Sequence, residues 1–261
     1  MPIRIAFWNI NTGTGSSDDR VLTFQAWCQA EAPDLLLLEE VSHTLENNLP
    51  GLTGLTRISH VNTRTKKLKP GTKQIWALQS ANAIATWNFQ ATVLSLPGLV
   101  GPRSLLKVTM KIKNLAYQDF ALWVLHAKAT QRGGREAVEA AQSYLAKNAG
   151  AVIGGDFNYS IGNAGLEAVA PLSWQVGINL NFTQWNKGNS TTRGPNARLH
   201  LVTPPPIQPV MYRSIEPHNV IDYVMLGRNR GAIPLANCAN EAIWIDILKN
   251  FDHCPVLYNL L

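Results

Sequence analysis

The chain of 261 residues has only three cysteines, Cys28, Cys238 and Cys254, and no pair of them shows the C-x-x-C spacing. An odd count without a cluster argues against a structural zinc site and against a disulfide framework. Isolated cysteines of this kind usually pack as small hydrophobic side chains. The fold therefore has to rely on a hydrophobic core, which a chain of this length can bury without metal or disulfide cross-links.

Long hydrophobic runs are also missing. No apolar stretch approaches the ~20 residues that a membrane-spanning helix needs. The N-terminal segment breaks at Asn9 and lacks the ~7–15 apolar residues of a secretory signal core. There is no internal repeat, and the 46% hydrophobic and 15% charged residues are typical of a globular protein. Disordered, collagen-like and disulfide-scaffold classes are excluded.

Acidic residues are absent from a long central stretch, Asn47–Gln118, which contains ten lysines and arginines. Since the whole chain carries a net charge of +6, the remainder is acidic, with a net charge of −4. A basic segment beside an acidic remainder favours a surface for a polyanion together with a cation site elsewhere. The alternative interpretation is an ordinary solvated basic face. Lys66, Lys67 and Lys69 are the candidate DNA-binding lysines in this segment.

Hydrophobic periodicity predicts an α/β fold. Helices are expected from Ser17 or Asp18 to about Glu31 and over Gly133–Lys147, with Pro33 ending the first. Strands are expected at nine places: Ile3–Trp8, Asp34–Glu39, Ile75–Leu78, Ala83–Trp87, Leu105–Ile112, Phe120–His126, Gly150–Gly155, Val220–Leu226 and Pro255–Asn259. Residues 171–218 are rich in Asn, Gly, Pro and Thr and are expected to form long loops between short strands. Without a linker between two hydrophobic halves, residues 1–261 are expected to form one domain built on packed sheets.

Polar residues that could bind a metal or transfer protons lie at or near the ends of several of these strands. They are Asn9, Glu40, His126, Asp156, Asn158, Asp222, Asp252 and His253. Catalytic groups often collect at strand ends, because the sheet is rigid and the following loop is open. Each residue alone has an ordinary structural explanation, such as a turn or a helix cap, but the set as a whole favours a site.

The chemistry of the set favours metal-assisted phosphodiester hydrolysis. Glu40, Asp156 and Asp252 offer the hard oxygen ligands that Mg²⁺ prefers, and Asn9 and Asn158 add neutral oxygens. Two histidines, His126 and His253, titrate near neutral pH and can transfer protons. Carboxylates for a cation, histidines for proton transfer and a basic flank for phosphate are the components of such a reaction.

Six motifs in a fixed order carry a family resemblance. The order WN, LLEEV, LHA, GGDFN, IDYV and DHCPV, from Trp8 to Val256, resembles the endonuclease/exonuclease/phosphatase superfamily of deoxyribonuclease I. The segment HAKATQRGGREAVEAAQSYL before GGDFN, the Pro70–Thr86 stretch and Arg103-Ser104 are similar to the branch of cytolethal distending toxin catalytic B subunits. The resemblance implies a four-layer α/β sandwich of two packed mixed β-sheets flanked by helices. It also implies Mg²⁺, with Mn²⁺ as an alternative, and DNA as the substrate. The toxin branch would imply partner subunits.

The resemblance also implies roles for individual residues. Glu40 would be the main metal ligand, with Asn9 and Asp252 near the metal. His253 would be the general base, oriented by Asp222, the one such carboxylate candidate that lies inside a predicted strand. In the same way, Asp156 and Asn158 would orient the attacking water and the phosphate, and His126 would contact a phosphate oxygen or protonate the leaving group. The candidate phosphate clamps are Arg103, Arg132 and Arg135.

Three positions depart from the pattern of the superfamily. Phe251 replaces the usual serine before Asp-His, and Glu39 replaces the usual glutamine before Glu40. Glu39 either alters metal affinity or points to the other face of the strand, since neighbouring strand residues alternate. The acid-free segment supplies no carboxylate partner for His126, so Gln79 or Asn82 is the candidate neutral partner.

Two enzyme hypotheses follow. The first is a Mg²⁺-dependent DNA endonuclease, resembling a toxin subunit. The second is a phosphatase for phosphoinositides or other phosphomonoesters on the same scaffold. The basic segment favours DNA, because duplex binding gains from many phosphate contacts spread over a surface. A third hypothesis, a non-catalytic module with a decayed site, conflicts with the presence of all the principal site residues.

Overall fold

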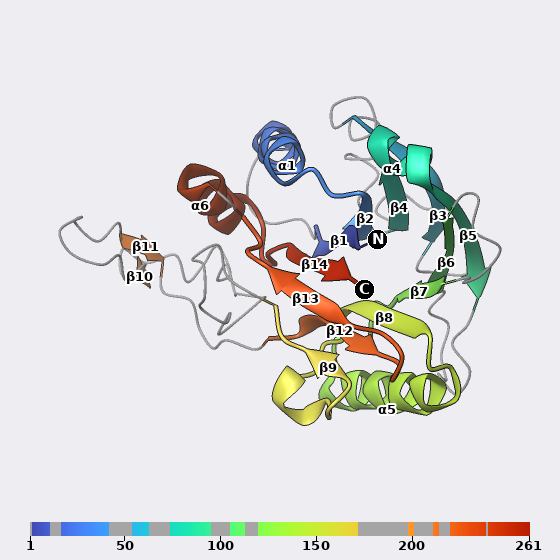
Figure 1. Cartoon of the computed structure of the whole chain (residues 1–261). Coiled ribbons are helices and arrows are strands. Elements are labelled where there is room, and N and C mark those ends of the chain that lie inside the picture. The colour runs from blue at the N-terminus through green and yellow to red at the C-terminus, as the bar shows by residue number, and fades with distance from the viewer. Residues whose placement is uncertain are drawn as a thin grey trace.

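Two mixed β-sheets packed face to face form the centre of the molecule, and helices cover both outer faces (Figure 1). The computed structural model describes residues 2–10, 17–41, 54–62, 74–94, 105–112, 120–171, 198–200, 211–213, 220–238 and 240–261. Within these residues the four layers agree with the α/β sandwich predicted from the sequence.

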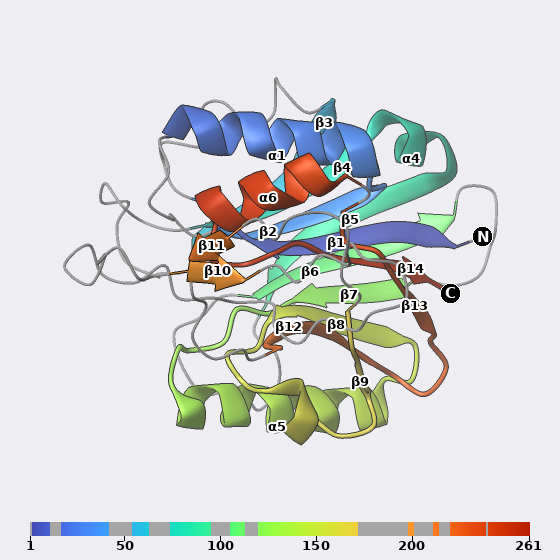
Figure 2. The same ribbon diagram turned by 90° about the vertical axis from the view of Figure 1, so that its left-hand side faces the viewer.

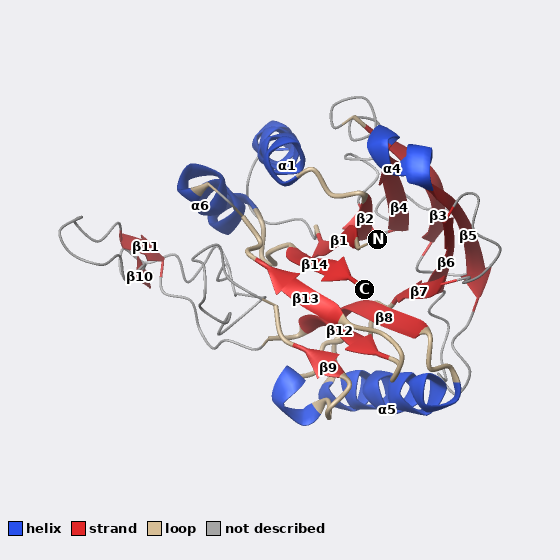
Figure 3. Ribbon diagram, in the orientation of Figure 1, coloured by secondary structure: helices blue, strands red, loops and turns tan. Residues whose placement is uncertain are grey.

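The first sheet has six strands in the order β13-β14-β1-β2-β4-β3 (Figure 3). Their bounds are β13 Ala232–Leu235, β14 Val256–Leu260, β1 Ile3–Asn9, β2 Leu35–Val41, β4 Gln74–Ser80 and β3 Leu55–Asn62. β1 and β2 are parallel, and the remaining neighbours are antiparallel.

The second sheet has six strands in the order β5-β6-β7-β8-β12-β9. Their bounds are β5 Trp87–Leu94, β6 Leu105–Ile112, β7 Phe120–Val124, β8 Ala151–Asp156, β12 Asp222–Leu226 and β9 Ala168–Val169. β7 and β8 form the parallel pair, and β12 runs antiparallel to both β8 and β9. A separate two-stranded ribbon is formed by β10 (Arg198–His200) and β11 (Met211–Arg213).

The alternation of side chains along β1 explains why the sheets stack. Ile3, Ile5 and Phe7 point into the hydrophobic layer between the two sheets. Ala6 and Trp8 point the other way, into the layer beneath the helices that cover the first sheet. A third cluster of buried side chains fills the space between the second sheet and its covering helix. Both sheets are thus buried on both faces over much of their area, as expected from near-continuous apolar runs such as LLLL in β2.

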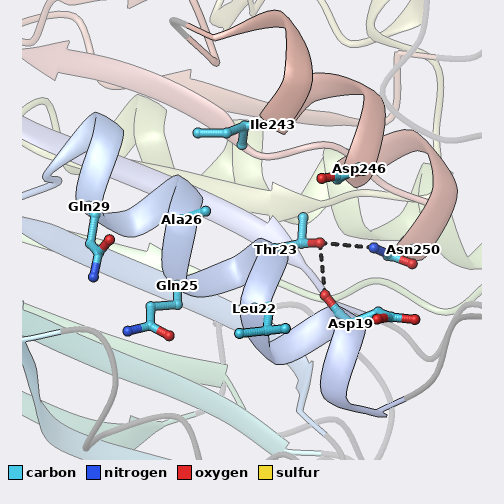
Figure 4. A pocket seen from close by; sticks show the side chains of 9 residues that line it. All are labelled: Asp19, Leu22, Thr23, Gln25, Ala26, Gln29, Ile243, Asp246 and Asn250. Carbon is cyan, nitrogen blue, oxygen red and sulfur yellow. Dashed lines mark hydrogen bonds between the residues drawn. The ribbon is translucent and has the colours of Figure 1, made fainter.

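Two helices, α1 (Ser17–Glu31) and α6 (Glu241–Asn250), lie side by side on the first sheet (Figure 2). Asn250 Nδ2 donates a hydrogen bond of 2.8 Å to Thr23 Oγ1 and joins the two helices. A groove of about 660 Å³ lies between them, and none of the predicted site residues that the structure describes lines it. Figure 4 shows the side chains around this groove. The lining side chains are Asp19, Leu22, Thr23, Gln25, Ala26, Gln29, Ile243, Asp246 and Asn250.

The second sheet is covered by α5 (Gln131–Lys147), whose first turn is capped by the Thr130 hydroxyl accepting from the Gly133 N–H. A short 3₁₀ helix, η1, spans Ile161–Asn163. None of the described helices combines the length and the apolar character that crossing a membrane requires.

The predicted strand over Ala83–Trp87 is wrong. The chain forms a short helix, α4 (Ala81–Thr86), before β5 begins at Trp87. The Ser80 hydroxyl accepts from the Ala83 N–H at 3.0 Å, and this N-cap together with the alanine-rich sequence favours the helix. The other predicted strands and both predicted helices are present with boundaries shifted by up to two residues. The predicted loop region 171–218 lies almost wholly outside the described residues, apart from β10 and β11.

Candidate metal-binding and catalytic site

The chain topology brings the predicted site residues to one end of the two sheets. Asn9 ends β1 and Glu40 lies near the end of the parallel strand β2, while Asp156 ends β8. His126 follows the end of β7, which is parallel to β8. Asp222 begins β12 and is the register partner of Asp156. This end of the sheets lies away from the chain termini (Figure 2).

Asp156 is the centre of the cluster and is almost completely buried. Its Oδ2 accepts a hydrogen bond of 3.0 Å from Asn9 Nδ2, and its Oδ1 accepts one of 2.8 Å from the Asn158 N–H. His126 Nε2 lies 3.7 Å from Asp156 Oδ2. Burial raises the pKa of the Asp156 carboxyl, and so does the negative charge of Asp222. The surroundings of Asp156 in the protein alone therefore disfavour its ionised form.

His253 and Asp222 form a buried pair, with Nδ1 of the histidine 2.9 Å from Oδ2 of the aspartate. His253 is only 2% exposed. Burial by itself would lower the pKa of His253, but the charge and hydrogen bond of Asp222, together with Asp156, raise it to about 10. The backbone around the histidine is fixed as well, because Trp8 Nε1 donates a 3.0 Å hydrogen bond to the His253 carbonyl. The pair predicted from the sequence is present in the geometry of an oriented base.

A β-bulge in β2 determines to which face of the strand the Glu39 side chain points. The register between β2 and β4 shifts between Leu38 and Val41, and Glu40 has a φ of 55°, in the left-handed region. The bulge breaks the normal alternation, so that both neighbouring carboxyl groups reach the site. Glu39 Oε1 and Oε2 accept from the Asp156 N–H at 3.0 and 3.2 Å. Glu40 Oε1 lies 3.1 Å from His126 Nε2.

Glu39 does not point to the other face of the strand. It is fully buried, and burial, followed by the charges of Asp156 and Asp222, raises the pKa of its carboxyl well above the usual range. Its hydrogen bonds hold the backbone of Asp156 in place.

The partner of His126 differs from the sequence-based expectation. The imidazole faces the carboxylates of Glu40 and Asp156, so it does not rely on a neutral amide. Gln79 pairs in register with Leu35 at the start of β2, at the opposite end of that strand from Glu40. Asn82 follows it in α4. The hypothesis that Gln79 or Asn82 contacts His126 is therefore wrong, because β2 separates the two ends by roughly 17 Å at about 3.3 Å per residue.

The glycine that precedes Asp156 is required by the packing around Glu39. Gly155 has a φ of +132°, and a Cβ built on it would lie 2.3 Å from both Glu39 Oε1 and the Leu125 carbonyl oxygen. Neither the backbone conformation nor the space admits a larger residue.

We expect Gly155→Ala to destabilise the fold by at least about 2 kcal/mol, since backbone strain costs about 1–3 kcal/mol and overpacking a similar amount. Chemical denaturation would measure the free energy of unfolding. Gly150→Ala is the matched control, because its added methyl would meet Arg230 only at 3.8 Å, an ordinary contact. Equal stability of the two variants would contradict the tight packing at Gly155.

The donor set fits a hard divalent cation. Glu39, His126 and Asp156 offer ligand atoms within 4.8 Å of one another, and Asp156, Asp222 and His253 form a second such group. Each group contains two carboxylates, and carboxylate oxygens are the ligands that hard divalent cations prefer. The raised pKa of Asp156 is the second reason that a cation fits, because a nearby positive charge would favour its ionised form. Asp156 belongs to both groups, so it is placed to contact a metal as well as to orient water.

The remaining predicted residues lie at the edge of this centre or outside the described part of the chain. Asp252 is half-buried beside His253, and Asn158 donates from Nδ2 to the Ala127 carbonyl at 3.0 Å. Arg132 and Arg135 project from α5 with side chains 90% and 68% exposed, and each is paired with a glutamate one turn on, at 2.8 Å. Their phosphate contacts stay a prediction. Arg103, Lys66, Lys67 and Lys69 lie outside the described residues.

The supporting roles of two residues, Trp8 and Glu39, were not predicted from the sequence. Trp8 donates a hydrogen bond to the His253 carbonyl. The centroid of its ring lies 4.6 Å from the ring centroid of Phe251, one of the residues that depart from the family pattern. Glu39 holds the Asp156 backbone. For Trp8 the available signal was its position directly before Asn9, at the end of a strand.

Comparison with known proteins agrees with this geometry. The sequence profile of the Endonuclease/Exonuclease/phosphatase family matches residues 6–232. The chain belongs to this family. Members of the Endonuclease/Exonuclease/phosphatase family are hydrolases of phosphate esters, and the Asp156-centred cluster is a candidate divalent-metal site for that chemistry. No curated protein sequence matches the chain significantly.

Several solved structures share the fold at low sequence identity. TDP2 of D. rerio, solved in complex with a single-strand DNA product, is 14% identical with a TM-score of 0.59, over 100% of this chain and 99% of that chain. The human nocturnin catalytic domain with bound sulfate is 16% identical with a TM-score of 0.60, over 100% and 94%. A mannosyl-6-phosphatase of Bacteroides thetaiotaomicron is 14% identical with a TM-score of 0.59, over 99% of both chains. These likenesses establish the fold alone.

Proposed function

We propose that the protein is a Mg²⁺-dependent phosphodiesterase that nicks DNA, with Mn²⁺ as an alternative cation, and that residues 1–261 form one catalytic unit. The observation that carries the proposal is the His253–Asp222 pair, at 2.9 Å, beside the buried carboxylate of Asp156. An oriented base next to an anionic centre is the arrangement that metal-assisted hydrolysis requires.

In this proposal His253 removes the proton from the attacking water. Its Nδ1 faces Asp222, so proton transfer takes place at Nε2. Asp222 holds the ring in one tautomer and stabilises the imidazolium that forms. The hydrogen bond from Trp8 to the His253 carbonyl keeps the ring in place during this transfer.

On the other side of the centre, Asp156 and Asn158 orient the water and the phosphate. The Asn158 N–H fixes one Asp156 oxygen and Asn9 fixes the other, so this carboxylate presents a defined face. His126, held beside Glu40 and Asp156, is placed to hydrogen-bond a phosphate oxygen or to protonate the leaving group.

The residues that would hold the cation are Glu40, Asn9 and Asp252, together with Asp156. When bound, a divalent cation would neutralise charge on the phosphate and offset the carboxylates that raise the pKa of His253. Glu39, although a carboxylate, keeps its oxygens on the Asp156 N–H and acts as a support for the backbone.

The choice of DNA is supported by the basic composition of residues 47–118, since duplex binding gains from many phosphate contacts. Of the structures with this fold, TDP2 was solved with a DNA product, whereas the Bacteroides protein is a mannosyl-6-phosphatase. A phosphomonoesterase activity is therefore the outcome that would replace the proposal. The narrower toxin-like hypothesis is supported by sequence alone, through the motif order from His126 to Asn158, the Pro70–Thr86 stretch and Arg103-Ser104. Nothing in the comparisons supports partner subunits.

We expect Mg²⁺ or Mn²⁺ to support nicking of supercoiled plasmid and EDTA to abolish it, because the donor set is rich in carboxylates and lacks thiolates. One preparation would be assayed for plasmid nicking and for phosphate release from phosphoinositides and from a sugar phosphate. Activity should return when excess Mg²⁺ is added back.

The control for a contaminating nuclease is the His253→Ala variant, purified in the same way. Full nicking in excess EDTA would contradict the metal assignment. Phosphate release without nicking would replace the diesterase with a phosphatase on the same site.

A further inference from the structure

An arginine that no motif pointed to lies near the candidate site. Arg20 is in the first turn of α1, and its side chain is half-buried. Two of its guanidinium nitrogens, Nε and Nη1, are buried and have no hydrogen-bond partner in the described part of the chain. Buried polar groups in native proteins nearly always have a partner, so this side chain is arranged for an acceptor that the described residues do not supply.

The position of Arg20 relative to the site follows from the packing of α1 on α6. Thr23, one turn further along α1, is bonded to Asn250 at the end of α6. The chain reaches Asp252 and His253 two and three residues after Asn250. The beginning of α1 therefore lies beside the segment that carries the proposed base.

The electrostatics agree with this placement. Burial lowers the pKa of Arg20, and the carboxylate of Asp252 acts in the opposite direction. Since an arginine stays protonated at neutral pH even after a downward shift, the guanidinium is a fixed positive charge. This positive charge lies within electrostatic range of Asp252, the neighbour of His253 in the chain.

We propose that Arg20 is a substrate-binding residue that holds a phosphate flanking the one being hydrolysed. This inference rests on the proposed function and deepens it, because it specifies a substrate with several phosphodiesters. A guanidinium donates through a planar fork that matches phosphate oxygens, and two buried N–H groups without acceptors are available for such a contact. The hydrolysed phosphate lies at the Asp156 and His253 centre, so the Arg20 contact falls on a neighbouring one.

The first test measures binding without catalysis. Wild type, Arg20→Gln and Arg20→Lys would be titrated onto a fluorescent DNA duplex in EDTA at several salt concentrations. Loss of one phosphate contact should lower the slope of log affinity against log salt by about 0.9. Arg20→Lys should keep most of the slope, because it keeps the charge, but should bind more weakly than wild type. Arg228→Gln is the matched control, since that arginine is exposed and follows β12 at the end opposite Asp222.

The second test separates a flanking phosphate from an effect on the reacting centre. With Mg²⁺, Arg20→Gln should raise KM for DNA by about 10- to 100-fold, the range expected for one hydrogen-bonded charged contact. Its kcat/KM for bis(p-nitrophenyl) phosphate, which has no second phosphate, should stay within about two-fold of wild type. A thermal melt of each variant reports whether it is folded, and Arg20→Lys gives the same comparison if the Gln variant is not.

Two results would overturn the inference. An equal loss on both substrates would mean that Arg20 acts through Asp252 and not on substrate. An unchanged salt slope with unchanged KM would mean that it contacts no phosphate. Failure of wild type to hydrolyse either diester would instead contradict the proposed function, and the metal-free binding measurement would still report on Arg20.

Discussion

Replacing His253 by alanine is expected to lower the rate of phosphodiester cleavage by at least about 10²–10⁴-fold, the contribution typical of general acid–base catalysis. Asp222 orients the ring at 2.9 Å, and the ring borders the Asp156 centre. The measurement is the initial rate of plasmid nicking at saturating Mg²⁺. His253→Gln provides a second variant with a similar volume, because alanine leaves the buried Asp222 without its partner and costs stability.

Asp222→Asn tests whether the two residues act as one unit. An amide can still bond Nδ1 but cannot stabilise the imidazolium, so this variant should also be strongly impaired. The double variant should be little slower than His253→Ala alone, because residues that work together give non-additive losses. Asp246→Asn, an exposed carboxylate on α6, is the matched control and should be as active as wild type.

If the rate loss of the double variant equals the product of the two single losses, Asp222 acts on something other than His253, for example by supporting the end of β12. A His253→Ala enzyme with nearly wild-type rate would contradict the base assignment and leave His126 as the remaining histidine candidate.

Local sequence patterns predicted the strands and helices whose type is decided by the hydrophobic residues within the segment itself. The apolar runs of β1, β2 and β8 are buried on both faces, and a buried strand of this kind is recognisable from its composition alone. The Ala83–Trp87 error has the opposite cause. Short alternation of apolar residues indicated a strand, but the cap at Ser80 decides the local structure in favour of α4. β3, β9, β13 and α6 were not predicted, and the two-residue strand β9 depends on pairing with β12, which is distant from it in the sequence.

The site residues also divide into those that local sequence identifies and those whose role depends on the three-dimensional structure. Polar residues after buried strands could be found from the sequence, since strand ends in parallel pairs meet at one edge of the sheet. The direction of Glu39 could not be found, because it depends on a bulge between β2 and β4 and on the left-handed φ of Glu40. Arg20 could not be found either, because its relation to Asp252 arises from the packing of α1 against α6, more than 200 residues apart in the chain.

Asp156→Asn is expected to separate activity from stability. The carboxylate is shared by both groups of candidate ligands and lies 3.7 Å from His126, so its loss should lower the nicking rate by about 10²-fold or more. Yet the buried charge is costly to the fold without a cation, because burial and the charge of Asp222 both disfavour the ionised form. The metal-free variant should therefore melt at a higher temperature than metal-free wild type.

The hydrogen bonds around residue 156 allow this exchange. The side-chain oxygen of the variant residue 156 can still accept a hydrogen bond from the Asn158 N–H. If the Asn9 amide rotates, the Asn9 side-chain oxygen can accept from the new NH₂ group at residue 156. Thermal melts of both proteins with and without Mg²⁺ are the decisive measurement. Because a cation that binds only the folded state raises its stability, Mg²⁺ should raise the Tm of wild type and raise that of the variant much less. An equal Mg²⁺ shift in both proteins, or a lower metal-free Tm for the variant, would mean that Asp156 is a structural carboxylate whose charge the protein already neutralises.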